Sequence, residues 1–205
     1  MRAYYRIMPV YSFILKKEGA ENVDGDLMIY EHKDGEPIQF VDDGMPDSLF
    51  MNVNLERVEF KDVNMSTVSF DKANMECAVF SAVNLNSASF ENAYLDHTTI
   101  YDASFAKAVI DGVGMEKSTL RNMNMFGTKF SDMNLSESEY DSVNLSNSRF
   151  GDCEMTDVEF DGPSLKNSRF ISCDLTNVEF KDCNIDGLII NGVDISELMK
   201  KSGNL

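Results

Sequence analysis

The pattern of apolar and polar residues repeats every five positions from residue 55 to residue 185. Every fifth residue there is Leu, Phe, Met, Ile or Tyr, giving 27 consecutive apolar centres without an insertion or a deletion. A second column of small residues, beginning Val53, Val58, Val63, precedes the centres by two positions, and the other three positions are mostly polar. A period of five fits neither an amphipathic helix nor a strand, so it indicates a repeat architecture.

The five-residue units resemble those of the pentapeptide-repeat family, which read approximately Ala-(Asn/Asp)-Leu-X-X. Residues 83–87 read Val-Asn-Leu-Asn-Ser, and residues 143–147 read Val-Asn-Leu-Ser-Asn. The resemblance implies an all-β fold, namely a right-handed quadrilateral parallel β-helix in which four units form each coil. It further implies about seven coils, with the apolar centres and the small column pointing inward.

The sequence itself supports a coil of 20 residues rather than 10. Acidic residues recur at Glu56, Glu76, Asp96 and Glu116, whereas the positions halfway between them hold Ser, Asn, Ala and Phe. Two of the four sets of centres are rich in Phe, so we expect ladders of stacked rings about 4.8 Å apart. In the small column, the bulkier Met123 and Met133 predict a local bulge or altered twist.

Three segments are expected along the chain. Residues 1–48 lack the five-residue ladder and form a β-rich N-terminal cap, in which residues 27–33 and 36–41 flank the hairpin signal Asp34-Gly35. A role for this segment as a partner-specific binding module is the open alternative. Residues 49–187 form the β-helix.

The third segment, residues 188–205, is expected to contain a capping helix. Asp194 and Glu197 have the spacing of a helix start, and Ile195, Leu198 and Met199 would form one apolar stripe. The helix would then serve either as a lid over the last coil or as the contact of a homodimer through the C-terminal end.

The overall charge narrows the classes of partner. The 205 residues include 35 acidic and 18 basic side chains, for a net charge of −17. This acidity argues against a nucleic-acid or anionic membrane partner and is compatible with a basic protein surface. Residues 7–15 are apolar but contain Pro9, and no signal-peptide cleavage pattern or transmembrane run is evident, so we expect a cytoplasmic protein.

The reactive residue types form no catalytic, cofactor or metal motif in the sequence. His32 and His97 are the two histidines, and neither belongs to a nucleophile or zinc pattern. Three cysteines are expected to fill the inward column as small hydrophobic residues, whereas Cys77 should point outward as a free thiol. The sequence therefore predicts a protein that is not an enzyme and has no cofactor.

The candidate site is a surface defined by charge. When outward positions are sorted by the 20-residue coil, two adjoining sides carry 17 acids and five bases. Like charges stacked one strand apart repel, so these acids either keep the protein soluble or bind a basic partner. The candidate partner-binding residues form two acidic columns: Glu56, Glu76, Asp96 and Glu116, and Glu139, Glu159 and Glu179.

These observations predict a non-catalytic protein-interaction scaffold. The family resemblance implies two alternatives. One is a DNA mimic that binds a type II topoisomerase such as DNA gyrase and modulates or protects it, although this chain lacks the loop insertions that several such proteins carry. The other is an immunity-like protein.

Overall fold

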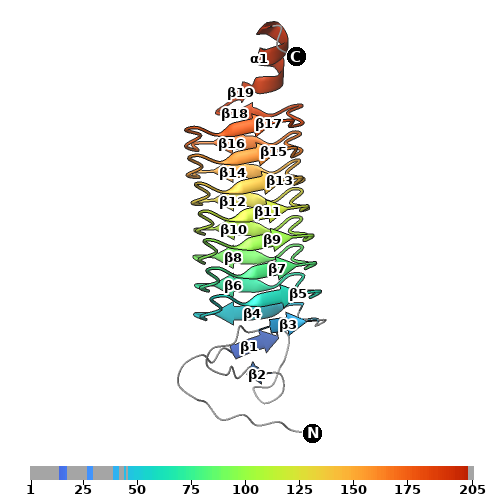
Figure 1. Cartoon of the computed structure of the whole chain (residues 1–205), viewed down its shortest axis with the longest axis vertical. Coiled ribbons are helices and arrows are strands. Elements are labelled where there is room, and N and C mark those ends of the chain that lie inside the picture. Colours follow the sequence, from blue (N-terminus) through green and yellow to red (C-terminus); the bar gives the residue numbers. More distant parts are fainter. Residues whose placement is uncertain (1–13, 18–26, 30–38, 42–43, 45, 203–205) are drawn as a thin grey trace.

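The computed structural model describes residues 14–17, 27–29, 39–41, 44 and 46–202, which form a long solenoid of short strands ending in a helix (Figure 1). Two sheets run along the rod. Sheet A contains β1 (Ile14–Lys17), β2 (Leu27–Ile29), β4 (Ser48–Met51), β6 (Ser69–Asp71), β8 (Ser89–Glu91), β10 (Val109–Asp111), β12 (Lys129–Ser131), β14 (Arg149–Gly151), β16 (Arg169–Ile171), β18 (Ile189–Ile190) and β19 (Val193–Asp194). Sheet B contains β3 (Gln39–Val41), β5 (Glu59–Lys61), β7 (Val79–Ser81), β9 (Thr99–Tyr101), β11 (Thr119–Arg121), β13 (Glu139–Asp141), β15 (Glu159–Asp161) and β17 (Glu179–Lys181).

Along the solenoid, each strand pairs in parallel with the strand 20 residues later. Ile110, for example, lies between Phe90 and Phe130 in sheet A. Isolated bridges such as Asn54 to Asn74 keep the same spacing between the strands. One coil therefore contains 20 residues, and the predicted parallel β-helix of about seven coils with a short C-terminal helix is confirmed.

The turns explain why the outward positions are rich in Asn, Asp and Gly. In nearly every unit, the second residue after the apolar centre has a positive φ, as at Asn92 (53°) and Gly112 (63°). This left-handed conformation is unfavourable for most L-residues and least so for Gly, Asn and Asp. The residue types at these positions are therefore explained first by the backbone conformation of the turn, before any role in binding.

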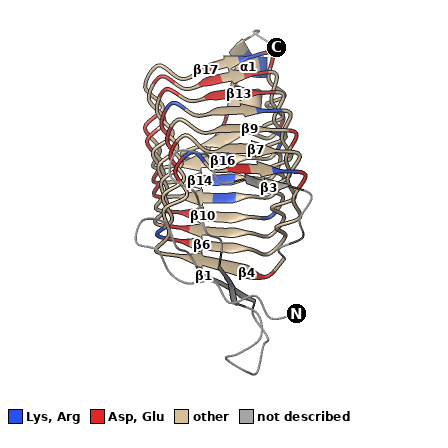
Figure 2. Ribbon diagram, turned by 60° about the horizontal axis from the view of Figure 1, so that its bottom comes forward, with Lys and Arg blue, Asp and Glu red and all other residues tan. Residues whose placement is uncertain are grey.

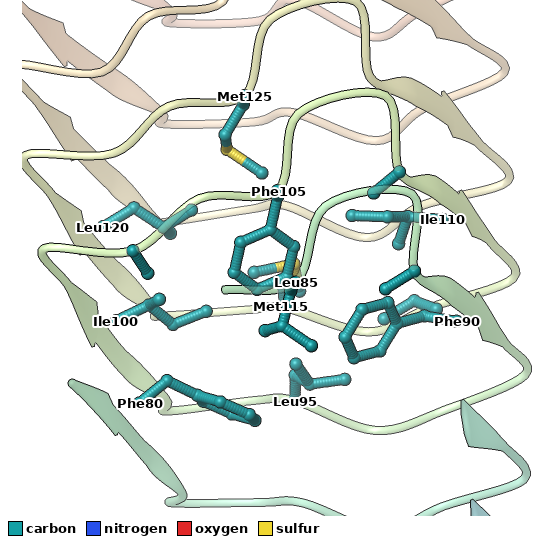
Figure 3. Packing of buried hydrophobic residues seen from close by; sticks show 14 of the residues in the cluster. Phe80, Leu85, Phe90, Leu95, Ile100, Phe105, Ile110, Met115, Leu120 and Met125 are labelled. Carbon is teal, nitrogen blue, oxygen red and sulfur yellow. The ribbon is translucent and has the colours of Figure 1, made fainter. Parts of the chain in front are cut away.

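The apolar centres form the core between the two sheets. Phe130, Phe150 and Phe170 stack with ring centroids 4.4 and 4.5 Å apart, which confirms the expected aromatic ladder. In the middle coils Ile100 and Ile110 replace Phe at the strand centres. The ring of Phe105, which comes from another side of the solenoid, occupies the space between these two isoleucines (Figure 3). This ring lies 5.6 Å from that of Phe90.

Most buried hydroxyl groups in the small inward column donate to backbone carbonyls, whereas the hydroxyl of Thr98 donates to that of Ser118. Thr128 donates to the carbonyl of Phe105, and Ser148 donates to the carbonyl of Met125, both at 2.8 Å. Because a buried hydroxyl without a partner is costly, these bonds explain how Ser and Thr replace Ala and Val at this position.

The bulge expected at Met123 and Met133 is wrong. Strands β10, β12 and β14 pair without a shift of register, and residues 144 and 154 bond normally to the carbonyls of the two methionines. Both side chains are buried, 3% and 2% exposed. Methionine is flexible enough to fill the available space without displacing the backbone.

At the N-terminal end, the ladder begins earlier than the sequence pattern indicated. Strand β3 pairs in parallel with β5, and Phe40 stacks on Phe60 at 4.9 Å. Strand β2 pairs with β1, which pairs antiparallel with β4. The expected hairpin between residues 27–33 and 36–41 is therefore wrong, because the described parts of its two arms, β2 and β3, belong to different sheets; residues 30–38 lie outside the described residues.

At the C-terminal end, α1 (Ile195–Ser202) begins where predicted. Asp194 accepts hydrogen bonds from the backbone N–H of Glu197 at 3.0 Å and the hydroxyl of Ser196 at 2.8 Å, which lower the pKa of its carboxyl. Leu198 is nevertheless 55% exposed, and the apolar centres of the last coil are only partly buried. The helix therefore covers that coil incompletely. Within the described residues, no helix is long and apolar enough to span a membrane.

Candidate protein-interaction faces

The first acidic column is aligned along the rod as predicted. The backbone N–H of Arg57 donates to the carbonyl of Glu76 at 2.8 Å, and equivalent bonds reach Asp96 and Glu116 on the following coils. These four residues therefore occupy one edge of four successive coils.

Each of the four carboxylates in this first column has a neighbouring partner, and two of these partners are cationic side chains. Arg57 lies 3.5 Å from Glu56, and the His97 ring lies 3.9 Å from Glu76. Lys117 pairs with Glu116, and this hydrogen bond lowers the pKa of that carboxyl. Asp96 instead accepts the backbone N–H of residue 116 at 2.8 Å, which makes it a structural group.

The second acidic column carries stronger uncompensated charge. Glu139, Glu159 and Glu179 are direct neighbours on β13, β15 and β17, and all three side chains are exposed. None of them forms an ion pair with another described residue. Asp141 and Asp161 lie on the same strands, although Asp161 is 3.5 Å from Lys181. Figure 2 shows the resulting red strands around β13 and β17.

The two columns do not form one continuous stripe. The first ends at Glu116, whose neighbour on the next coil is Ser136, whereas the second begins at Glu139. They therefore occupy different halves of the rod on adjoining sides. We take the column Glu139, Glu159 and Glu179 as the better candidate for binding a basic surface.

Sorting the sequence by side missed a second charged arrangement on sheet A. The outward positions of that side include five acids and four bases, so its total charge is nearly neutral. The strand register places three of the acids and three of the bases in separate columns on different coils, while Asp132 and Asp152 lie in the turns that follow basic strands. The residues of the two columns are Asp71, Glu91 and Asp111, and Lys129, Arg149 and Arg169. The 20-residue spacing of these residues was the signal that could have revealed them.

The cysteines lie where the repeat places them. Cys77 is exposed, Cys153 is buried, and Cys173 and Cys183 are partly buried. Cys153 and Cys173 are neighbours on adjacent coils, where a hydrogen bond from the Cys153 thiol lowers the pKa of Cys173 to about 7. The same contact raises the pKa of Cys153. In the described part of the chain, no group of three His, Cys, Asp or Glu residues is arranged to hold a metal ion.

A shallow depression crosses the side of the rod between residues 82 and 144. It is widely open and lined mainly by small polar residues, among them Asn84, Ser104 and Asn144. No histidine or cysteine lines it. The depression therefore lacks the enclosed apolar walls and converging reactive groups that are typical of a catalytic pocket.

Several solved structures have similar folds. A trypsin-treated variant of QnrB1, a plasmid-mediated fluoroquinolone resistance protein, is 15% identical, with 81% of this chain and 96% of that chain covered and a TM-score of 0.51. Full-length QnrB1 is 15% identical, with 80% of this chain and 99% of that chain covered and a TM-score of 0.40. HetL is a pentapeptide repeat protein involved in heterocyst differentiation regulation from the cyanobacterium Nostoc sp. strain PCC 7120. It is 13% identical, with 76% of this chain and 88% of that chain covered and a TM-score of 0.33.

The first of these likenesses supports the fold alone, because the sequence identity is low. No curated protein matches the sequence. Two family profiles do match: one described as pentapeptide repeats (8 copies) at residues 48–86 and 73–112, and one described as a pentapeptide repeat region at residues 113–190. Together they span residues 48–190, most of the chain, and the chain belongs to the pentapeptide-repeat family.

Proposed function

We propose that the protein is a non-catalytic interaction scaffold whose acidic column on sheet B binds a basic protein surface. The observation that supports this proposal is the exposed, in-register stack of Glu139, Glu159 and Glu179. Each carboxylate is one strand spacing, about 4.8 Å, from the next. The stack is unfavourable for the isolated rod, and a cationic partner would relieve the repulsion.

The flat sheet determines how such a partner would bind. Short parallel strands present their outward side chains from a rigid surface, so little conformational entropy is lost when a partner docks. Arg and Lys side chains would contact the carboxylates at the rim, and their charges would also accelerate encounter. We therefore expect association that is fast at low salt and weakens as the ionic strength rises.

The test is a triple variant, Glu139→Gln, Glu159→Gln and Glu179→Gln. A partner recovered with the wild-type protein should associate with this variant at least tenfold more slowly at low salt, with a flatter salt dependence. The matched control, Glu56→Gln, Glu76→Gln and Glu137→Gln, changes the net charge equally and should retain binding. Equal association of the triple variant and the wild type at every salt concentration would refute the proposal.

A DNA mimic that acts on DNA gyrase is the second candidate. It is supported by the acidic sides of the rod and by the fold shared with QnrB1, a plasmid-mediated fluoroquinolone resistance protein. The protein should then inhibit supercoiling by gyrase or protect the enzyme from a fluoroquinolone. Absence of gyrase binding at micromolar protein and low salt would remove this candidate and leave the scaffold proposal intact.

A homodimer through the C-terminal end is a third candidate, and it is an alternative to self-association through a side of the rod. Val193 and Leu198 are 48% and 55% exposed beside the incompletely covered last coil. A second copy would bury these apolar groups, in line with the usual tendency of open solenoid ends to be covered.

A further inference from the structure

The strands of sheet A carry two columns of opposite charge in the two halves of the rod. On β6, β8 and β10 an acidic column contains Asp71, Glu91 and Asp111; on β12, β14 and β16 a basic column contains Lys129, Arg149 and Arg169. The three basic side chains are exposed, as are Glu91 and Asp111, and Asp71 is half-buried. Figure 2 shows blue strands around β14.

The basic column is unexpected in a chain with a net charge of −17. Its residues repel one another at one strand spacing, and none of them forms an ion pair with any other described residue. The acidic column is only weakly compensated, since Asp71 lies 3.8 Å from Lys72 and Glu91 accepts a hydrogen bond from Ser89. Neither column therefore has a complete set of ion pairs within its own chain, although Asp132 and Asp152 lie in the turns that follow β12 and β14.

The two columns are arranged symmetrically about the middle of the sheet. Eight parallel strands run from β4 to β18, and the midpoint between β10 and β12 has three acidic strands on one side and three basic strands on the other. We propose that two copies of the chain associate through sheet A, face to face and antiparallel, with a twofold axis at this midpoint. The axis places β12 against β10 of the other copy, β14 against β8, and β16 against β6.

The charges select this orientation over the parallel one. In the antiparallel pair every basic strand faces an acidic strand, whereas in a parallel pair Arg149 would meet the same arginine of the second copy. The sizes of the facing residues also suit this orientation. The twofold axis sets Arg149 opposite the small Ser89, and Glu91 opposite Gly151. The long Arg side chains can then extend diagonally to the carboxylates.

Exposed apolar groups complete the surface. Met51 and Val109 are 49% and 41% exposed, and Leu49, Ile171 and Ile189 are partly exposed on the same outer face. The proposed axis places β4, which carries Leu49 and Met51, against β18, which carries Ile189. The charged middle of the interface would therefore have an apolar contact at each end, and the single self-complementary surface closes as a dimer.

The size of the face sets the expected affinity. Eight strands at about 4.8 Å spacing and three residues of about 3.3 Å give a flat area of roughly 380 Å² per copy. Stable interfaces bury about 800 Å² per partner, so this dimer should be weak and reversible. It should form at about 100 μM protein in about 20 mM salt and dissociate at about 0.5 M salt, where charges are screened within a few ångströms.

Analytical ultracentrifugation of charge-reversal variants tests the proposal. Reversing the basic column (Lys129→Glu, Arg149→Glu and Arg169→Glu) should abolish the dimer, as should reversing the acidic column (Asp71→Lys, Glu91→Lys and Asp111→Lys). A mixture of the two variants should form a heterodimer at least tenfold tighter than the wild-type dimer. The control Lys107→Glu, Arg121→Glu and Lys166→Glu has the same net charge as the first variant and should still dimerise.

Spin labels test the orientation. A label at residue 51 should lie about 34 Å along the rod from its counterpart, seven strand spacings away, whereas a parallel dimer would bring the two labels together. A dimer that survives both reversals but is lost on Leu198→Glu would show end-to-end association and overturn the proposal. A protein that remains monomeric at about 100 μM and low salt, with circular dichroism unchanged, would also overturn it.

Discussion

At the scale of single residues, backbone conformation rather than chemistry decides many outward positions. Ala82 has φ 51°, while the residues one coil away, Asp62 and Asp102, have 55° and 53°. A left-handed conformation costs an ordinary L-residue about 1–2 kcal/mol, and Gly avoids this cost but loses more chain entropy on folding. Because Ala82 is exposed, replacing it by Gly sacrifices little packing.

We expect Ala82→Gly to raise the free energy of unfolding by about 1 kcal/mol, measured by urea denaturation. Ala106 is the matched control, because it lies at a turn position where φ is not positive. Ala106→Gly should lower the free energy of unfolding by about 0.5–1 kcal/mol. Destabilisation by both substitutions would contradict the assignment of strain to residue 82.

At the scale of one coil, large and small core residues compensate for one another. Ile100 and Ile110 are smaller than the Phe residues at equivalent strand centres, and Phe105 fills the volume they leave (Figure 3). Interiors are packed closely enough that such substitutions are energetically coupled. The break in the aromatic ladders is therefore a local repacking.

This coupling gives a double-mutant prediction. Phe105→Leu should destabilise the protein by about 1–2 kcal/mol through a cavity, and Ile110→Phe by about 1–3 kcal/mol through overpacking. The two substitutions together should cost at least 1 kcal/mol less than the sum of the separate effects, measured by denaturation. Strict additivity would show that Phe105 and the strand centre do not share one space.

The elements themselves were predictable from the sequence to different degrees. Each centre between residues 55 and 185 could be placed because one short period determines which side chains point inward. The ends were harder: β3 carries Phe40 in the ladder but lies within a segment without a visible repeat. Pairing of β2 with β1 rather than with β3 depends on a non-local contact that a local turn signal such as Asp34-Gly35 does not encode.

The candidate sites were predictable only in part. The 20-residue spacing placed both acidic columns correctly, because stacking follows directly from the coil. It did not reveal that Asp96 bonds to the backbone of residue 116 or that Lys117 neutralises Glu116. Those contacts depend on side-chain conformations at the turns. The halves of sheet A were missed because total charge on a side does not record its distribution along the rod.

At the scale of the whole rod, the two acidic columns should respond differently to neutralisation. Glu139, Glu159 and Glu179 stack in register, without an ion pair among the described residues. The triple Gln variant should therefore gain up to about 1 kcal/mol and show a higher Tm at low salt. Added salt should reduce this gain, because it screens the repulsion that the substitutions remove.

The first column should behave in the opposite way because its residues already have partners. Asp96 accepts the backbone N–H of residue 116 at 2.8 Å, so Asp96→Ala should lower stability by about 1 kcal/mol. Substituting Glu76, whose contact with His97 is 3.9 Å and exposed, should change the Tm little. The Tm of each variant, measured by thermal denaturation at about 20 mM and about 0.5 M salt, tests these expectations. If Asp96→Ala is stabilising and the triple Gln variant is not, repulsion between stacked carboxylates does not govern the stability of this rod.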